Sequence, residues 1–381
     1  MTTSDRRRRP VALLLARLVW LALAGLAGVA GLEILLQYRV AVKEAFVRDD
    51  SRVGQLRRAY AAFNVQHLHP HYLFFFPLSA ADRAAIGNAV CSIDRDGFRE
   101  PGPAHANGRK LAVLLGGSAA FGDYASSNAT TITSYMNAMQ DEYFFVNAGV
   151  PSWNSTQELV RMAVQVAALR PALVITYDGA NDAGLAGLAH STTGAPYPPG
   201  TPDSFDELDD VVNRSSGWKR PTAATALPEV MLRVEKYRVA LFGQGPVPEP
   251  PLDPAREAAV AARYLASLEQ IAALSRAAGA RYLSVFQPIA RLHQNVRPSF
   301  AADDDIADFH ARVVARPPAF EFHDLSAVFD QYLAEIPVLE TDLTAETVFV
   351  DGVHLHDRGN ELVARHLLGL IGQDPERRPA P

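Results

Sequence analysis

Residues 111–122 read Leu-Ala-Val-Leu-Leu-Gly-Gly-Ser-Ala-Ala-Phe-Gly, and this stretch decides the fold. Five apolar residues come first, and a glycine pair then leads into a single serine, Ser118. A short apolar run that ends in glycine is typical of a strand buried on both faces of a parallel sheet. Because ligands bind at the carboxyl ends of such strands, we expect Ser118 to lie where a reacting group would sit. Gly-Gly-Ser is also an ordinary tight turn, so this motif needs further support.

Four more apolar runs follow the first one, with helical segments between them. The predicted strands are residues 111–115, 144–146, 173–177, 282–286 and 322–325. The clearest predicted helices are residues 157–169, 253–278, 305–315 and 358–370. Strands that alternate with helices indicate a parallel sheet with helices on both faces. The sequence therefore predicts a three-layer α/β/α domain, doubly wound around a five-stranded parallel sheet.

One segment, residues 184–254, interrupts this alternation and is rich in Pro, Gly, Ser and Asp. Loops this long inside a domain are usually functional or disordered. We interpret the segment as an insertion or lid that selects the substrate. Residues 373–381 are predicted to form a polar, frayed tail.

The amino terminus predicts a membrane anchor. A basic tail, residues 1–10, precedes residues 11–36, which are apolar except for Arg17 and Glu33. About 20 apolar residues are enough to cross a bilayer core as a helix. A cleaved signal peptide is the alternative, because residues 22–24 have a small-x-small pattern, but the apolar run continues well past them.

Basic residues lie on both sides of the predicted anchor, so its orientation depends on their density. The cluster of four arginines at residues 6–9 favours a cytoplasmic amino terminus, although four basic residues follow the anchor between residues 39 and 52. We therefore expect a single-pass protein of the cytoplasmic membrane whose main domain is extracytoplasmic, in the periplasm of a Gram-negative cell. Residues 37–108 are predicted to form a helical stalk and a lead-in to the sheet.

Composition excludes several classes of protein. The formal net charge is -6, and no basic block occurs beyond the first ten residues, which argues against a nucleic-acid partner. Cys91 is the single cysteine, so an intramolecular disulfide and a four-cysteine metal site are excluded. His67, His69 and His71 alternate, but Pro70 lies among them and favours a loop over a metal site. We expect neither a metal nor a cofactor.

Two further predicted strands end in residues that can donate hydrogen bonds to an oxyanion. The second ends in Asn-Ala-Gly-Val-Pro, residues 147–151, and the third in Asp-Gly-Ala-Asn-Asp, residues 178–182. The backbone N–H groups of Ser118 and Gly149 and the side-chain amide of Asn181 are the predicted donors. Taken singly, Gly149 is an ordinary turn residue and Asn181 an ordinary helix cap.

The last motif is Asp-Gly-Val-His-Leu-His, residues 351–356, immediately before the final predicted helix. A serine hydroxyl becomes a good nucleophile when a neutral imidazole removes its proton, and that imidazole needs an acceptor for its other nitrogen. His354 is the predicted base and Asp351 the predicted acceptor. The residues alone leave His356 open as an alternative base.

In this order, the four motifs around Ser118, Gly149, Asn181 and His354 resemble those of the SGNH/GDSL hydrolases. The resemblance covers the predicted domain, residues 109–372, and implies a flavodoxin-like sheet and a metal-free site. It also implies that Ser118, His354 and Asp351 form a catalytic triad. The usual Gly-Asp-Ser-Leu motif is here Gly-Gly-Ser-Ala, which is similar to membrane-anchored, polysaccharide-modifying members of the family, as is, more loosely, the Asp-Gly-Phe-Arg of residues 96–99.

The resemblance implies an esterase acting on acyl esters, with acetyl esters as the expected substrates. Phe121, Trp153 and Asp182 lie next to the motifs and are predicted to contact the substrate. Two alternatives stay open: an O-acyltransferase that modifies an extracytoplasmic polysaccharide, and a catalytically silent glycan-binding or assembly protein. The sequence does not specify an oligomeric state.

Overall fold

The computed structural model describes residue 20 and residues 51–61, 90–186, 254–293, 304–316, 318–335 and 343–372. Apart from Trp20, all of these belong to one compact unit made of residues 49–201 and 249–381, which is described by itself. The predicted anchor (apart from Trp20), most of the stalk, residues 187–253 of the predicted insertion and the tail lie outside the described residues. Within the described ranges, no helix combines the length and the apolar composition needed to cross a bilayer.

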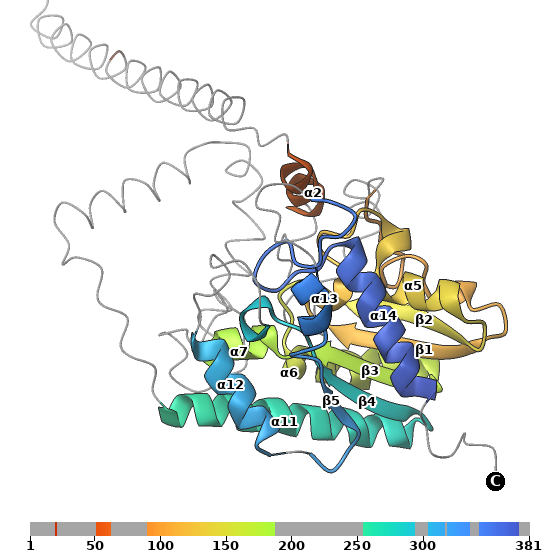
Figure 1. Ribbon diagram of the computed structural model, residues 1–381. Coiled ribbons are helices and arrows are strands. Elements are labelled where there is room, and N and C mark those ends of the chain that lie inside the picture. Colours follow the sequence, from red (N-terminus) through yellow and green to blue (C-terminus); the bar gives the residue numbers. More distant parts are fainter. Residues whose placement is uncertain are drawn as a thin grey trace, which may run out of the picture. The chain divides into compact units, whose positions relative to one another are not determined.

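The centre of the unit is a five-stranded parallel sheet (Figure 1). Its strands are β1 (Lys110–Gly116), β2 (Tyr143–Gly149), β3 (Leu173–Asp178), β4 (Arg281–Phe286) and β5 (Phe322–Asp324). They lie in the order β2-β1-β3-β4-β5, and all neighbouring pairs are parallel. All five predicted strands are confirmed, and the strand order is that of the flavodoxin-like doubly wound folds.

Helices cover both faces of the sheet, which completes the predicted three layers (Figure 1). One face carries α6 (Ser155–Arg161), α7 (Ala180–Ala186), α11 (Pro254–Ala277) and α12 (Asp304–Val314). The other carries α5 (Ile132–Met139), α13 (Asp330–Glu335) and α14 (Asp357–Gly372). The helix predicted at residues 157–169 is α6 continued by η3 (Met162–Val166) and η4 (Ala167–Leu169).

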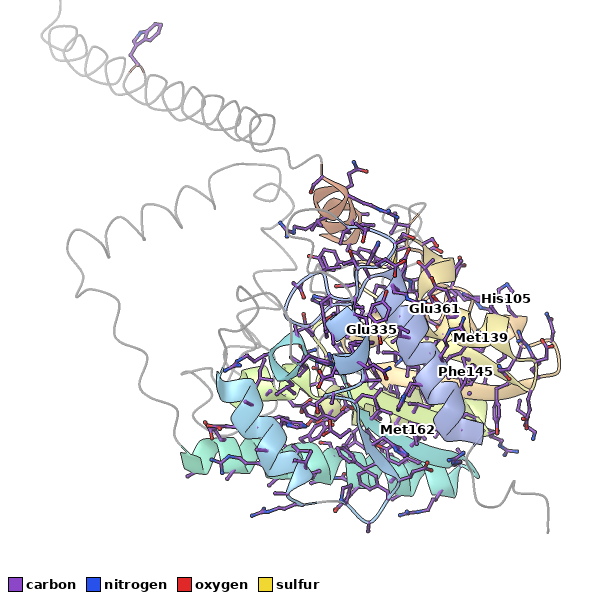
Figure 2. The ribbon with its side chains drawn as sticks, in the orientation of Figure 1. His105, Met139, Phe145, Met162, Glu335 and Glu361 are labelled. Atoms are coloured by element: carbon purple, nitrogen blue, oxygen red, sulfur yellow. The ribbon has the colours of Figure 1, made fainter. Side chains whose placement is uncertain are left out.

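The two cores follow from the alternation of side chains along each strand. In β1, Val113 packs into the core on one face, and Leu114 into the core on the other. Met162 and Phe145, which belong to these two cores, are labelled in Figure 2. Since both faces are buried, residues 111–115 of β1 are all apolar, as expected for a parallel sheet between helices.

The outer edge of β2 is closed by side-chain amides instead of a sixth strand. Asn137 on α5 donates to the carbonyl of Phe145 (2.9 Å) and accepts from its N–H (2.8 Å). Gln140 makes the same pair of bonds with Tyr143 (2.9 and 2.8 Å). These backbone groups are therefore satisfied although no strand lies beside them.

A third, smaller core joins the lead-in to the sheet. The helix α2 (Arg52–Ala61) buries Leu56 and Tyr60 in a cluster that also contains Phe121 and Trp153. Four short helices complete the described elements: η1 (Pro103–His105), α4 (Ser118–Phe121), η2 (Asn128–Thr130) and η5 (Ala290–Leu292). Of these, α4 carries Ser118, so this core lies directly beneath the serine.

Candidate active site

Ser118 is the first residue of α4, at the carboxyl end of the central strand β1. The chain passes directly from the strand into the helix at two glycines. Gly116 has a φ of 154, which side-chain-bearing residues rarely adopt, and a Cβ on it would lie 2.3 Å from the carbonyl oxygen of Tyr177. A Cβ on Gly117 would lie 2.4 Å from Nδ2 of Asn181. The glycine pair therefore lets β3 and Asn181 approach the backbone of the serine.

Ser118, His354 and Asp351 form a continuous chain of hydrogen bonds. Nε2 of His354 lies 2.8 Å from Oγ of Ser118, and Nδ1 lies 2.7 Å from Oδ2 of Asp351. The other carboxylate oxygen accepts from the N–H groups of Val353 (2.9 Å) and His354 (2.8 Å), which fixes the turn before α14. The predicted nucleophile, base and acceptor are thus brought together although 236 positions separate Ser118 from His354.

The charged groups around His354 suit a general base. Burial lowers the pKa of His354, but the hydrogen bond and charge of Asp351 and the charge of Asp123 outweigh burial, so the pKa is raised. Burial also raises the pKa of Asp351, but its bonds to His354 and to the backbone prevail and lower it. Asp351 therefore stays ionised and stabilises the imidazolium that forms when His354 accepts a proton.

His356, the alternative base, serves a structural purpose. Its side chain is buried, and Nδ1 lies 2.9 Å from the carbonyl oxygen of Tyr124. Because a carbonyl only accepts, Nδ1 must carry the proton. The bond ties the start of α14 to the loop that follows α4, and His354 is left as the base that contacts Ser118.

Two of the three predicted oxyanion donors lie close together. Asn181, on α7, donates through Nδ2 to the carbonyl oxygen of Trp153 (2.7 Å) and lies against Gly117, so its second amide hydrogen is available beside Ser118. The N–H of Ser118 has no hydrogen-bond partner in the described part of the chain. Both groups can therefore donate to an oxygen that approaches the serine.

Gly149, the third predicted donor, is not available. Its N–H donates to Oδ1 of Asn147 (3.0 Å), and a Cβ on it would lie 2.3 Å from the backbone nitrogen of Phe121. Its small size lets α4 pack directly on β2, and that is a structural need. Among the described residues, the exposed Ser152 has an N–H without a partner, and it holds a left-handed φ of 66. The prediction of Gly149 as a donor is therefore wrong, and this N–H of Ser152 lies three residues further along the chain.

The two aromatic residues predicted to contact the substrate belong to the core instead. Phe121 and Trp153 are 2% and 1% exposed, and both pack in the cluster with Leu56 and Tyr60. The ring that does face the site is that of Tyr124, whose centroid lies 5.4 Å from that of His354. All three rings are close to the motifs in the sequence. That closeness does not tell which ring packs in the core under Ser118 and which lies beside His354.

Asp182, the last predicted contact, is buried and structural. Its carboxylate accepts from the N–H (3.1 Å) and Oγ (2.6 Å) of Ser155 at the start of α6. Burial raises the pKa of Asp182 to about 6, against the lowering effect of these bonds. Glu158 and Asp178 are buried nearby, and within the described ranges no group of three His, Cys, Asp or Glu side chains is placed to hold a metal ion.

Arg99 supports the short helix α4 that carries Ser118, and its motif at residues 96–99 matched the family only loosely. The residue is fully buried, and Nη1 donates to the carbonyl oxygens of Phe121 and Gly122, at 2.8 Å each. Nη2 donates to the hydroxyl of Tyr60 (2.8 Å). Arg99 thus binds the carboxyl end of α4, the short helix whose first residue is Ser118. This contact gives the Gly-Phe-Arg segment before β1 a structural role.

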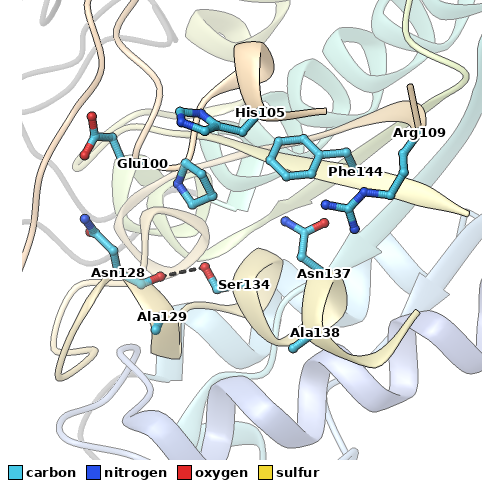
Figure 3. A pocket seen from close by; sticks show the side chains of 10 residues that line it. Glu100, His105, Arg109, Asn128, Ala129, Ser134, Asn137, Ala138 and Phe144 are labelled. Carbon is cyan, nitrogen blue, oxygen red and sulfur yellow. Dashed lines mark hydrogen bonds between the residues drawn. The ribbon is translucent and has the colours of Figure 1, made fainter. Parts of the chain in front are cut away.

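A cavity of about 610 Å³ lies apart from this chain of residues (Figure 3). Its lining comes from the segment before β1, from α5 and from β2, and includes Glu100, His105, Arg109, Asn137 and Phe144. None of its lining residues belongs to the hydrogen-bonded chain of Ser118. Most of its polar groups already bond within the protein, as Asn137 does with β2.

No protein-family model and no curated protein matches the chain. Solved structures do. An acetyl xylan esterase matches at 14% identity over 68% of this chain and 99% of its own, with a TM-score of 0.39. A GDSL-like lipase from Bacteroides thetaiotaomicron matches at 16% identity over 69% and 88%, with a TM-score of 0.36. A catalytic mutant of an acetylxylan esterase from Geobacillus stearothermophilus matches at 14% identity over 69% and 94%, with a TM-score of 0.37. At this level of similarity, the chemistry follows from the residues of this chain alone.

Proposed function

We propose that this chain is a membrane-anchored serine esterase of the SGNH/GDSL type that acts on acyl esters, with acetyl esters as the first to test. One observation carries the proposal: the unbroken chain from Oγ of Ser118 through His354 to Asp351, with distances of 2.8 and 2.7 Å. A serine, an imidazole and a carboxylate in this order are the elements of acyl transfer through a covalent intermediate.

In the proposed reaction, Oγ of Ser118 attacks the ester carbonyl as Nε2 of His354 takes its proton. Asp351 accepts from Nδ1 and stabilises the imidazolium. The imidazolium then protonates the departing alcohol, which leaves an acyl group on Ser118. Water, activated by the same histidine, attacks this acyl-enzyme and releases the acid.

The tetrahedral oxyanion needs donors that are already in place before the reaction. We assign this role to the N–H of Ser118 and to the side chain of Asn181. The N–H of Ser152 is the proposed third donor, because the turn that contains it leads into Trp153, whose carbonyl oxygen binds Asn181. This set replaces the one predicted with Gly149.

Labelling with a fluorescent fluorophosphonate tests the nucleophile directly. The full chain should react once, and Ser118→Ala should abolish the label because no other serine has an imidazole aligned on it in the described part of the chain. Equal labelling of the variant would show that the assigned serine is wrong. A wild-type chain that never reacts would favour the glycan-binding or assembly alternative.

The acceptor decides between hydrolysis and transfer. The chain would be incubated with 4-nitrophenyl acetate, with and without an oligosaccharide. If all of the acetyl group is released as free acetate, the chain is an esterase. If acetylated oligosaccharide forms, the chain is an O-acyltransferase. Neither product should form with Ser118→Ala, which serves as the matched control in both arms.

The proposed location is the cytoplasmic membrane, with the domain on the extracytoplasmic side and residues 11–36 as the anchor. The arginine cluster before an apolar stretch supports it. Extraction of membranes with alkaline carbonate tests the anchor, and amino-terminal sequencing tests cleavage. A chain that begins near residue 25 and is released by carbonate would overturn the anchor in favour of a signal peptide.

A further inference from the structure

Asp123 is a buried carboxylate beside the proposed triad that the reaction as derived does not use. It lies five residues after Ser118, and its N–H donates to the carbonyl oxygen of that serine (3.0 Å). The residue is 4% exposed, and Oδ1 is buried without a hydrogen-bond partner in the described part of the chain. A buried carboxylate that forms no hydrogen bond is costly, so its charge must be stabilised in another way.

Three ionisable groups lie close enough to Asp123 to shift the pKa of its carboxyl. They are the imidazole of His354, the guanidinium of Arg99 and the carboxylate of Asp351; Tyr60 and Cys91 are also close enough to respond to its charge. The next residue, Tyr124, packs its ring 5.4 Å from that of His354, so the backbone at this point lies against the imidazole.

The buried guanidinium of Arg99 leaves its charge available to Asp123. All of its donors go to uncharged oxygens, among them those of Tyr60, Phe121, Gly122 and Asn128. In the described residues it hydrogen-bonds to no carboxylate. Among the described residues, Arg99 and Asp123 form no hydrogen bond or ion pair. The positive charge of Arg99 therefore acts on the carboxylate of Asp123 through space.

The four groups have a simple charge balance. With His354 neutral, one positive and two negative charges give a net charge of -1. When His354 takes the proton of Ser118, the sum becomes zero. The negative charge that balances this gain passes to the tetrahedral oxyanion, which the N–H of Ser118 and the side chain of Asn181 are proposed to bind. Without the charge of Asp123, the imidazolium would have Asp351 as its one nearby carboxylate and would lie near the positive charge of Arg99, which is less favourable at low dielectric.

We infer that Asp123 is a second carboxylate that stabilises the imidazolium form of His354 through space, a positioning residue for the proposed proton transfer. Above pH about 6 Asp123 is ionised, and it takes no proton during the reaction. The proton moves from Oγ of Ser118 to Nε2 and then to the leaving alcohol. The inference rests on the proposed function and deepens it, because it assigns a residue outside the Ser-His-Asp chain.

The pKa directions agree with this geometry. Burial raises the pKa of Asp123 to about 6, with His354 and Arg99 lowering it and Asp351 raising it. The charge of Asp123 in turn contributes to the raised pKa of His354. Each of the two groups therefore shifts the pKa of the other toward its charged form.

The test compares Asp123→Asn with the matched variant Asp357→Asn in the full chain. Asp357 is also a partly buried aspartate, but its carboxylate binds the N–H (2.8 Å) and Oγ (2.6 Å) of Ser126, away from the proposed proton transfer. The rate of fluorophosphonate labelling is measured from pH 5 to 9. For Asp123→Asn we expect the acidic limb to move about one pH unit lower and the plateau to fall about tenfold. Asp357→Asn should keep the limb of the wild-type chain.

A limb that stays in place in a folded Asp123→Asn would overturn the inference, since a merely structural role lowers the rate without moving the limb. The titration of His354, followed by NMR in Ser118→Ala, tests it independently of activity: Asp123→Asn in that background must lower the pKa. If the wild-type chain never labels, the proposed function fails while this titration still decides the inference. If Asp123→Asn does not fold, the titration in Ser118→Ala alone decides, since a single step without a second inflection near pH 6 would overturn the coupling.

Discussion

His354 and His356 are two residues apart, yet their rings have different environments. The first bonds to a hydroxyl and a carboxylate, and the second to a backbone carbonyl. The sequence could not distinguish them, because spacing alone does not tell which ring faces the sheet edge. The difference gives a matched pair of variants.

His354→Gln should lower kcat/KM by about 10⁴-fold or more, because among the described residues His354 is the base that contacts Ser118. His356→Gln keeps a donor for the carbonyl of Tyr124 and should retain most of the activity, with a loss of about 1 kcal/mol in unfolding free energy at most. Steady-state hydrolysis of 4-nitrophenyl acetate and urea unfolding measure the two effects. Equal loss of activity in both variants would contradict the assignment of the base.

Asn181→Ala should lower kcat by about 10²- to 10³-fold with little change in KM, because the amide acts on the oxyanion and hardly on the bound ester. Ser152→Ala is the control, since the proposed donor at that position is the backbone N–H and the replacement keeps it. A loss on Ser152→Ala as large as that on Asn181→Ala would mean that the side chain of Ser152 takes part.

The triad could be predicted from the sequence, whereas the third oxyanion donor could not. Asp351 and His354 are three residues apart in one turn, so local geometry brings them together, and the end of a strand fixes Ser118. Whether the N–H of Gly149 is free depends on the side chain of Asn147, which no periodicity reveals. Ser152 was missed for the same reason.

Among the elements of the fold, the short helix α4 is stabilised by side chains that lie outside it. It has only four residues, too few to be stable alone. Arg99 binds its last carbonyl groups, and Asn147 of β2 donates to the carbonyl of Ala120 (2.8 Å). The position of Ser118 therefore depends on side chains from the lead-in and from the neighbouring strand.

Arg99→Met should destabilise the chain by about 3 kcal/mol or more, because several buried carbonyl groups lose their donor and Asp123 loses its counter-charge. Arg95→Met, four residues earlier on a side chain that is 88% exposed, should have little effect. Urea midpoints measure both. If Arg99→Met unfolds at the same urea concentration as Arg95→Met, the lead-in does not hold α4.

Elements with a strong period were predicted, and those stabilised by tertiary contacts were missed. The long helices α11 and α14 and the strands β1 to β4 show in the sequence because apolar residues dominate their buried positions. The expected strand at residues 144–146 was too short, since Asn147 is polar but buried in β2. The helices α4, α5 and α13 have four to eight residues and offer too few turns for a period.

For the whole molecule, buried acids link stability to pH. Burial raises the pKa of Asp178 to about 7, and those of Asp123 and Asp182 to about 6; burial and the charge of Asp178 also raise the pKa of Glu158. A raised folded-state pKa means that the folded chain binds the proton more tightly than the unfolded one. The resulting stabilisation is complete below the unfolded pKa near 3.8 and is lost as pH rises through 6 to 7.

We therefore expect the melting temperature to fall between pH 5 and pH 8, and to fall less in Asp178→Asn, which removes one of these groups. The exposed residue Asp141 provides the control: Asp141→Asn should follow the wild-type curve. Thermal unfolding followed by circular dichroism at fixed ionic strength measures the slope. An Asp178→Asn curve as steep as that of the wild-type chain would exclude this aspartate as a source of the dependence.

The amides of Asn137 and Gln140 along β2 have a consequence for assembly. An exposed strand edge is a template on which a second chain can add its own strand, the first step of ordered aggregation. Here the outward N–H and C=O groups of Tyr143 and Phe145 already have partners. A strand from a second chain would have to displace these four hydrogen bonds before it could pair with β2. Asn137 on α5 and Gln140 directly after it thus occupy this edge of the sheet, so a second copy of the chain gains little by adding a strand to it.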